Sequence, residues 1–169
     1  MTIHSSNPFA DAPDPVRRFR GRLGGAVSLW TAGTGSTRAG LTVSSMMVVN
    51  GAPGRVLGLL DPDSSLRDVL EDTGLGVVQL LEWGDRDLAD AFGGVAPAPG
   101  GPFTLGSWNQ SPHGPALADR THALVRLESS EVVGWSVLAT ATIEEIVMAE
   151  EHHPLEHRRG RYQKGGSGR

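Results

Sequence analysis

Apolar and polar residues alternate over short runs along most of the chain, which is the pattern of strands rather than of long helices. Such runs cover residues 26–32, 41–50, 55–60, 76–81, 122–133 and 135–148. The last two runs meet at Gly134, and the second is rich in β-branched residues, so they predict two long paired strands. Many short strands with only brief helices are typical of a small β-barrel.

The first two runs are separated by the glycine-rich segment 33–40, GTGSTRAG. A short glycine-rich turn between two strand-like runs predicts a β-hairpin. The segment lacks the Gly-Lys-Ser/Thr ending of a nucleotide-binding P-loop, so it predicts a turn and not a phosphate loop of that kind.

Three short helices are predicted between the strands. The first begins at Asp14-Pro15, with the proline at the first helical position, and ends near Gly24-Gly25. The second is SLRDVLEDT, and the third covers residues 85–92. The proline and glycine segment 95–102 is predicted to be a surface loop, with a lid as the alternative.

The composition predicts one domain. The chain has 169 residues, 38% of them apolar, which suits a single core at residues 14–162. Residues 1–13 are polar and aperiodic and predict a flexible arm, and residues 163–169 predict a disordered tail. There is no cysteine, which excludes disulfides and thiolate chemistry.

Charge and hydropathy exclude two classes of partner. The formal net charge is −4, and no basic stripe extends beyond Arg17 to Arg22 and the tail, so no nucleic-acid face is predicted. No apolar run has the length of a membrane span, and the first residues do not have the pattern of a signal peptide. A soluble, cytoplasmic protein is the expectation.

Candidate chemistry concentrates between residues 40 and 65, GLTVSSMMVVNGAPGRVLGLLDPDSS. Hydroxyl and carboxyl groups stand at the two ends of apolar runs, at Thr42, Ser44, Ser45, Asp61, Ser64 and Ser65. The second group precedes a helix, whose N-terminus favours anions, so a phosphorylated ligand is predicted. The alternative is that Ser65 only caps that helix, with Asp68 three residues later.

The stretch from Gly40 to Gly94 resembles the flavin reductase-like, FMN-binding split-barrel family. The resemblance rests on a GxTxSS motif, a proline after a short turn, an aspartate and serine loop, and a helix ending in Phe-Gly. It continues more weakly through Trp108, 114–119 and 154–162, and so spans most of residues 16–162. It implies a mainly β fold, a six-stranded antiparallel split β-barrel of Greek-key type with short flanking helices.

The resemblance also implies ligands and a site. The cofactor would be FMN or FAD, NAD(P)H would donate electrons, and a homodimer interface would complete the flavin sites. Flavin would be held at Thr42, Val43, Ser44 and Ser45, partly through the backbone, because neighbouring side chains of a strand point to opposite faces. The ribityl chain and phosphate would lie at Asp61, Ser64, Ser65 and Arg67, with Arg38 and Arg55 as further phosphate partners.

Two further groups follow from the same resemblance. Val78 and Gln79 would line the ring edge, or would be core positions. His157, Arg158, Arg161 and Tyr162 would contact the nicotinamide dinucleotide or close the barrel.

One motif departs from the family. Many of its reductases have Gly-Asp-His where this chain has Gly134, Trp135 and Ser136. Trp135 and Ser136 therefore occupy the positions of the catalytic motif, and Trp135 would stack on the ring, block the nicotinamide or serve in the core or dimer interface. Hydride transfer between cofactors needs chiefly close stacking, so the loss of the histidine need not abolish it.

The predicted function is NAD(P)H-dependent reduction of FMN or FAD, with the reductase component of a two-component monooxygenase as one form of it. The alternative is a flavin-binding or carrier protein without nicotinamide chemistry. A deazaflavin or haem remains open as the planar ligand, although His4, His113 and His122 do not form an axial-ligand motif.

Two other chemistries lack their motifs. His152, His153 and His157 are close in sequence, but Pro154 lies among them and there is no H-E-x-x-H frame, so no metal site is predicted. A serine hydrolase is excluded because no G-x-S-x-G elbow occurs.

Overall fold

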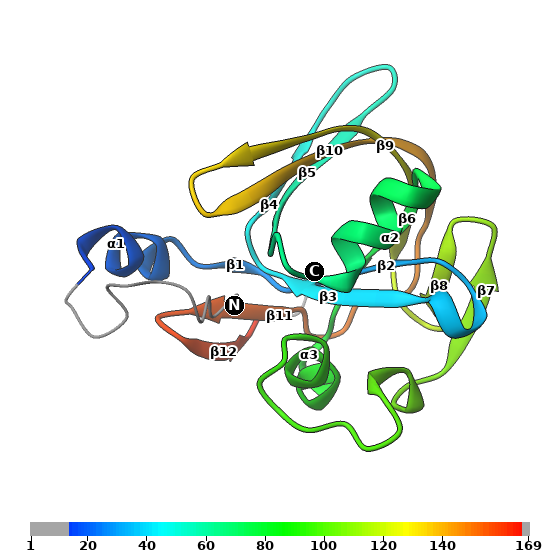
Figure 1. The fold of residues 1–169 in the computed structure, drawn as a ribbon. Coiled ribbons are helices and arrows are strands. Elements are labelled where there is room, and N and C mark those ends of the chain that lie inside the picture. The colour runs from blue at the N-terminus through cyan, green and yellow to red at the C-terminus, as the bar shows by residue number, and fades with distance from the viewer. Residues whose placement is uncertain (1–13, 167–169) are drawn as a thin grey trace.

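The computed structural model describes residues 14–166, which form a mainly β fold with three α-helices (Figure 1). The helices are α1 (Pro15–Leu23), α2 (Ser65–Thr73) and α3 (Arg86–Phe92). The strands are β1 (Gly25–Ala26), β2 (Ser28–Ala32), β3 (Ala39–Val43), β4 (Met46–Val49), β5 (Arg55–Leu60), β6 (Leu75–Leu80), β7 (Trp108–Ser111), β8 (Gly114–Leu117), β9 (His122–Val133), β10 (Ser136–Val147), β11 (Leu155–Arg158) and β12 (Arg161–Lys164). The predicted arm 1–13 lies outside the described residues, as do residues 167–169.

The largest sheet has seven strands in the order β3-β2-β6-β9-β10-β5-β4, and every pairing in it is antiparallel. It curls around the core (Figure 1). The expected fold class is thus confirmed, with seven strands in the main sheet instead of six. A second sheet has the order β1-β11-β12, and β7 pairs with β8.

The additional strand arises because the predicted strand 41–50 is two strands. β3 pairs with β2 at one edge of the curled sheet, whereas β4 pairs with β5 at the opposite edge. Ser44 and Ser45 connect them, and the Leu59 backbone N–H donates to the Ser45 carbonyl across 2.9 Å. Two residues therefore cross the split between the two edges of the sheet. Alternation of side chains does not reveal where a strand changes its partner, which is why the prediction missed this break.

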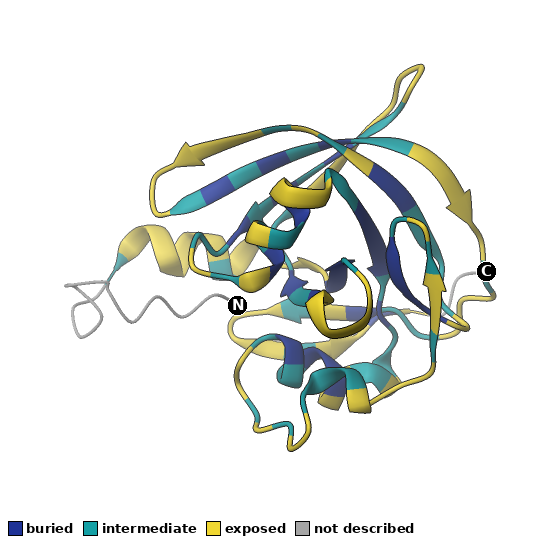
Figure 2. Cartoon of the chain, turned by 45° about the vertical axis from the view of Figure 1, so that its right-hand side comes forward, coloured by how far each residue is buried: buried dark blue, intermediate teal, exposed yellow. Residues whose placement is uncertain are grey.

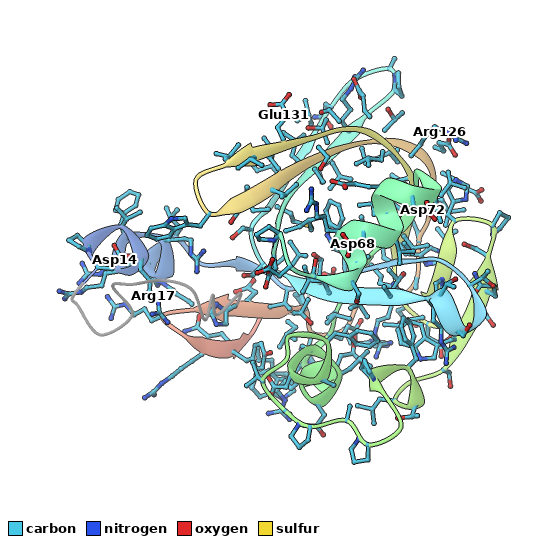
Figure 3. The ribbon with its side chains drawn as sticks, in the orientation of Figure 1. Asp14, Arg17, Asp68, Asp72, Arg126 and Glu131 are labelled. Carbon is cyan, nitrogen blue, oxygen red and sulfur yellow. The ribbon has the colours of Figure 1, made fainter. Side chains whose placement is uncertain are left out.

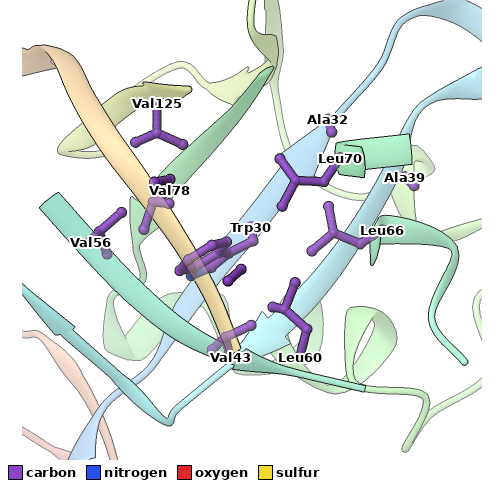
Figure 4. Packing of buried hydrophobic residues seen from close by; sticks show 12 residues of the cluster. Trp30, Ala32, Ala39, Val43, Val56, Leu60, Leu66, Leu70, Val78 and Val125 are labelled. Carbon is purple, nitrogen blue, oxygen red and sulfur yellow. The ribbon is translucent and has the colours of Figure 1, made fainter. Parts of the chain in front are cut away.

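The core inside the curled sheet centres on Trp30, which is 1% exposed (Figure 4). Gly58 makes room for it, since a Cβ at that position would lie 2.5 Å from the Trp30 ring. The helix α2 covers the core with Leu66 and Leu70, both of which are buried. The same cluster includes Val43, Val56, Leu60, Val78 and Val125.

The helix ends follow from local chemistry. The carboxylate of Asp14 accepts hydrogen bonds from the backbone N–H groups of Val16 and Arg17, and Pro15 is the first residue of α1, as predicted. In α2 the cap is Ser64 and not Ser65. The Ser64 hydroxyl accepts from the Arg67 N–H at 3.3 Å, and Ser65 is the first helical residue.

The predicted hairpins are present. β2 pairs with β3 around the glycine-rich turn, and β9 pairs with β10 around Gly134, whose φ of 58° suits glycine. β12 extends to Lys164, so the first residues of the predicted tail belong to a strand.

No helix within residues 14–166 is long and apolar enough to cross a membrane.

Candidate functional site

A cleft opens beside the split in the sheet, between α1, the Ser44–Ser45 crossing and β11. It consists of two adjoining cavities of about 380 and 460 Å³, which share Arg20, Gly21, Ser44 and His157. Both volumes fall in the range of about 300–1,000 Å³ that is usual for small-molecule sites. The cleft is therefore large enough to hold a cofactor or a substrate.

The smaller of the two, the apolar cavity, has walls of aliphatic side chains and glycine backbone. These residues are Leu23, Gly24, Gly25, Met46, Met47, Leu57, Gly58, Leu59 and Leu138. Ser44 and Ser45 are its hydroxyl-bearing residues, and within residues 14–166 neither hydroxyl makes a hydrogen bond. An apolar wall with unused hydroxyls at one side suits a planar ring that carries polar atoms on one edge.

The larger of the two, the arginine cavity, is lined by five guanidinium-bearing residues. Four are on α1, at Arg17, Arg18, Arg20 and Arg22, and the fifth is Arg159 in the turn between β11 and β12. Within the described part of the chain none of the five makes an ion pair, and no carboxylate lines this cavity. Guanidinium groups bind phosphate and carboxylate oxygens in pairs, so the chemistry of this cavity suits an anion.

None of the residues of α1 is buried, so hydrogen bonds to its backbone carbonyls hold the helix in place. The Arg159 backbone N–H donates to the Gly21 carbonyl at 2.8 Å, and the Arg158 guanidinium donates to the Arg22 carbonyl at 3.3 Å. Gly24, with a φ of 64°, then turns the chain into β1, which pairs with β11. These contacts hold the arginines of α1 against the turn that carries Arg159.

His157 on β11 borders both cavities. Burial lowers the pKa of His157, and the Arg20 guanidinium lowers it further, so the imidazole is mainly neutral at pH 7. Its ring packs edge-on against Tyr162, with the ring centroids 5.9 Å apart. The Tyr162 hydroxyl donates to Asp90 at 2.7 Å, and burial raises the pKa of that hydroxyl, so it keeps its proton.

The structure brings some of the predicted flavin residues together at this cleft. Ser44 and Ser45 line it, and Thr42 lies just behind, where its hydroxyl donates to the Ala89 carbonyl at 2.7 Å. Val43 points into the core. A further cavity of about 100 Å³ is bordered by Thr42, Ser44, His157 and Tyr162.

The predicted phosphate loop lies outside both cavities of the cleft. The Ser64 hydroxyl donates to the Asp61 carbonyl at 2.8 Å in addition to capping α2. Arg67 pairs with Glu71 at 3.0 Å, and the Glu71 carboxylate also accepts from Ser130 at 2.6 Å. The Ser64 hydroxyl and the Arg67 guanidinium are thus engaged within the fold, and Ser65 is exposed.

Val78 and Gln79 are core positions, which was the alternative reading of the sequence. Gln79 is fully buried; its amide nitrogen donates to the Thr31 hydroxyl at 2.9 Å, and its amide oxygen accepts from the Leu117 N–H at 2.6 Å. Neither residue lines the cleft. Arg38, a further candidate for phosphate, stacks on Phe103, and Arg55 pairs with Glu128 at 2.7 Å.

The residues of the departing motif lie at the tip of the β9–β10 hairpin. Trp135 is 60% exposed, and neither Trp135 nor Ser136 lines the two cavities. The hairpin tip and α1 project toward the same side of the molecule (Figure 1). The structure therefore excludes Trp135 from the hydrophobic core. Arg158 and Arg161 are exposed and also lie outside the cavity linings.

Sequence reasoning missed the arginines of α1 as site residues. The sequence shows four arginines within six residues as a local basic run, and the same helix has no acidic residue to pair with them. That absence was the available signal, because a solvated helix face usually mixes both signs of charge. Arg159 carried no signal, since only the fold brings it to α1.

Comparison with known proteins gives concordant results. The family model described as flavin reductase like domain matches residues 20–166. An "FMN reductase (NADH) RutF" of Methylorubrum extorquens strain DM4 is 31% identical over 151 residues, covering 86% of this chain and 72% of the relative.

Two solved structures share the fold. The "NADH:FAD oxidoreductase SgcE6" of Streptomyces globisporus superposes with a TM-score of 0.80 at 20% identity, covering 98% of this chain and 99% of the other. BorF, the flavin reductase component of a bacterial two-component tryptophan halogenase, superposes with a TM-score of 0.79 at 16% identity, covering 91% of this chain and 98% of the other.

Proposed function

Because the chain belongs to the flavin reductase-like domain family, we propose that it is an NAD(P)H-dependent flavin reductase that binds FMN or FAD in the apolar cavity. The observation that carries this proposal is that the apolar cavity and the arginine cavity adjoin and share Ser44 and His157 in their linings. A planar ring and a phosphorylated dinucleotide fit such a pair, and hydride transfer requires that two cofactors lie in contact.

Bound flavin supplies the redox chemistry itself, and the protein supplies binding and orientation. The hydroxyls of Ser44 and Ser45 are available to the polar edge of the ring. The neutral imidazole of His157 offers a hydrogen bond without adding charge between the two cavities. The arginines supply the positive charge that the phosphates of an electron donor require.

We also propose that the protein is a homodimer. Apolar side chains are exposed next to the apolar cavity, on α1 at Phe19 (68%) and Leu23 (69%) and on β4 at Met47 (64%) and Val48 (62%). A second subunit that covers them would bury these side chains and close the cavity from solvent. Size-exclusion chromatography with light scattering should give twice the chain mass, and Val48→Asp should give the single mass with weaker flavin binding.

The role of reductase component in a two-component system is the finer form of the proposal. It is supported by the fold shared with the halogenase reductase component, and it would supply reduced flavin to a separate monooxygenase or halogenase. It requires that many equivalents of free flavin are reduced per protein chain, which a turnover assay with excess FMN or FAD measures directly.

The first test is an anaerobic absorbance titration of the protein with FMN and then FAD, followed by NADH or NADPH. The flavin bands should bleach with at least one nicotinamide. Bands that persist with both would leave a flavin carrier as the function, and failure to take up either flavin would overturn the site as well.

A matched pair of variants tests the location. Ser45→Leu fills the apolar cavity and should weaken flavin binding at least about tenfold, a factor that corresponds to about 1.4 kcal/mol. Ser65→Leu is the control, because Ser65 is exposed and lies outside the cleft. Equal loss in both variants would contradict the apolar cavity as the flavin site.

A further inference from the structure

We propose that the cationic end of the molecule, which comprises residues 14–26 and 155–164, captures phosphorylated nucleotides from solution by long-range electrostatic attraction. Arg161 and Lys164 serve this capture, although neither residue lines the cleft. The inference rests on the proposed flavin reductase function, and it adds how the anionic flavin and nicotinamide nucleotides reach the site.

Positive charge is concentrated in the cationic end, although the whole chain has a net charge of −4. Its two segments contain eight arginine and lysine residues, four of them on α1, and two carboxylates. Residues 27–154 contain six arginines and sixteen carboxylates. The two segments meet because β1 pairs with β11 and the Arg159 N–H donates to the Gly21 carbonyl (Figure 1). An anion is therefore repelled by most of the molecule and attracted by one end of it.

The arginines outside the cationic end are all engaged with other side chains. Four form ion pairs with carboxylates and two stack on aromatic rings; the six are Arg38, Arg55, Arg67, Arg86, Arg120 and Arg126. By contrast, no ion pair within residues 14–166 involves a cation of the cationic end. These charges are not neutralised by a partner, so their field extends into the solvent.

Arg161 and Lys164 belong to β12 and are exposed. Neither side chain makes a hydrogen bond or an ion pair in the part of the chain that the structure describes. Arg161 is two residues from Arg159 of the arginine cavity, a separation of about 7 Å along an extended chain, and Lys164 is three residues further. Because the Debye length is about 10 Å at 0.1 M salt and about 30 Å at 0.01 M, both charges act at low salt on a phosphate that approaches the cavity.

The ligand class follows from where the charge lies. FMN, FAD and NADH all carry phosphate groups, and the arginine cavity adjoins the apolar cavity at Ser44 and His157. A nucleotide drawn to the arginine cavity therefore arrives beside the place proposed for the flavin ring. Steering of this kind raises association rate constants by about 10–10³ and weakens steeply with ionic strength.

The first experiment measures the association and dissociation rate constants of FMN and of riboflavin by stopped-flow flavin fluorescence. Riboflavin has the same ring and no phosphate, so it is the uncharged probe. We expect the association rate constant of FMN to fall at least about tenfold between about 0.01 M and about 0.5 M salt, and that of riboflavin to change less than about twofold. Equal salt dependence for the two ligands would overturn the proposal.

Variants then locate the effect. Arg161→Gln/Lys164→Gln should lower the association rate constant of FMN about two- to fivefold at low salt and leave its dissociation rate constant within about twofold. Arg55→Gln/Arg126→Gln is the control, since it removes the same charge from exposed ion pairs outside the cleft. A loss confined to dissociation, or an equal loss of association in the control, would refute the capture role.

Glu156→Gln tests the same field with the opposite sign. Of the two carboxylates in the cationic end, Asp14 caps α1 and Glu156 is exposed on β11. Removing the charge of Glu156 should raise the association rate constant of FMN about twofold at low salt. A purely structural role of this end would give no such gain, so an unchanged or lower rate constant would contradict the proposal.

Reduction is measured separately, as bleaching of bound flavin by NADH. Bleaching by NADH together with salt-independent association of FMN would refute the capture role and leave the reductase function intact. If NADH did not bleach the flavin while association of FMN still depended on salt and on Arg161 and Lys164, the reductase function would fail and the capture role would stand.

Discussion

The helices α1 and α2 have nine residues each and begin at a side-chain cap, yet they serve opposite purposes. α2 buries Leu66 and Leu70, whereas α1 buries no residue and is exposed along its length (Figure 2). On α2, Arg67 is paired with Glu71, and on α1 the arginines have no ion-pair partner within the described residues. Figure 3 shows Asp68 and Asp72 on α2 well apart from Arg17 on α1.

The difference shows that a polar side chain already bonded within the protein serves the fold, whereas one without a partner is available to a ligand. The hydroxyl and guanidinium of the α2 region are already hydrogen-bonded inside the protein, so they stabilise the fold. The arginines of α1 form no ion pair within residues 14–166, so their guanidinium groups remain available to an anionic ligand. The proposed site therefore lies beside α1, and not at the α2 loop where the sequence predicted the phosphate.

The largest expected effect is the loss of a core contact of α2. Leu66→Ala should lower the free energy of unfolding by about 2–5 kcal/mol, because the side chain is 0% exposed and its removal leaves a cavity. Val16→Ala on α1, where the side chain is 76% exposed, should change it by less than about 0.5 kcal/mol. Urea denaturation measures both, and a similar loss in the two variants would remove the contrast between the helices.

The cap of α2 should have the next largest effect. Ser64→Ala should cost about 1 kcal/mol of stability, since it removes the acceptor for the Arg67 N–H, and it should leave the affinity for flavin unchanged. Ser65→Ala serves as the control and should be nearly neutral in both measurements. If Ser64→Ala instead kept full stability and bound flavin more weakly, the result would support the phosphate-binding role that the sequence predicted for Ser64.

The ion pair of α2 should contribute less. Arg67→Gln should lower stability by about 0.2–0.5 kcal/mol at low salt, which is typical of pairs four residues apart, and the loss should fade at high salt. Arg18→Gln, which breaks no ion pair among residues 14–166, should be neutral or slightly stabilising. Denaturation at two salt concentrations gives the comparison, and a loss in Arg18→Gln equal to that in Arg67→Gln would contradict it.

The smallest expected effect is a pH dependence at the α1 side. His157 has a folded-state pKa below its usual 6.5, so the unfolded chain takes up a proton first as the pH falls. Stability should therefore be complete above pH 6.5 and decline as the pH falls from there to the folded-state pKa. Thermal unfolding at stepped pH should show this decline in the native protein and a flatter curve in His157→Gln. Identical curves would exclude the histidine as its cause.

The fold could be predicted further than the site. Pro15 and Asp14 determine the start of α1, and Gly134 allows the tight turn of the long hairpin, so these elements follow from local chemistry. The break at Ser44–Ser45 could not be predicted, because it depends on which edge strand each half pairs with. That pairing is a property of the whole curled sheet.

The resemblance to the family predicted Ser44, Ser45 and His157 as site residues, and all three line the cleft. Their roles await experiment. For Gln79 the sequence left the ring edge and the core open, and the structure agrees with the core, where both ends of the amide are hydrogen-bonded. The arginine cavity could not be read from the chain, since Arg22 and Arg159 meet only after β1 has paired with β11.

The pairing of β1 with β11 determines when the cleft can form during synthesis of the chain. The walls of the cleft come from positions as distant as Arg20 and His157, so most of the chain must leave the ribosome before they can meet. Contacts of such long sequence separation form late and slowly. A polypeptide released before β11 would lack one wall of the cleft, so incomplete synthesis products would not form the proposed flavin site.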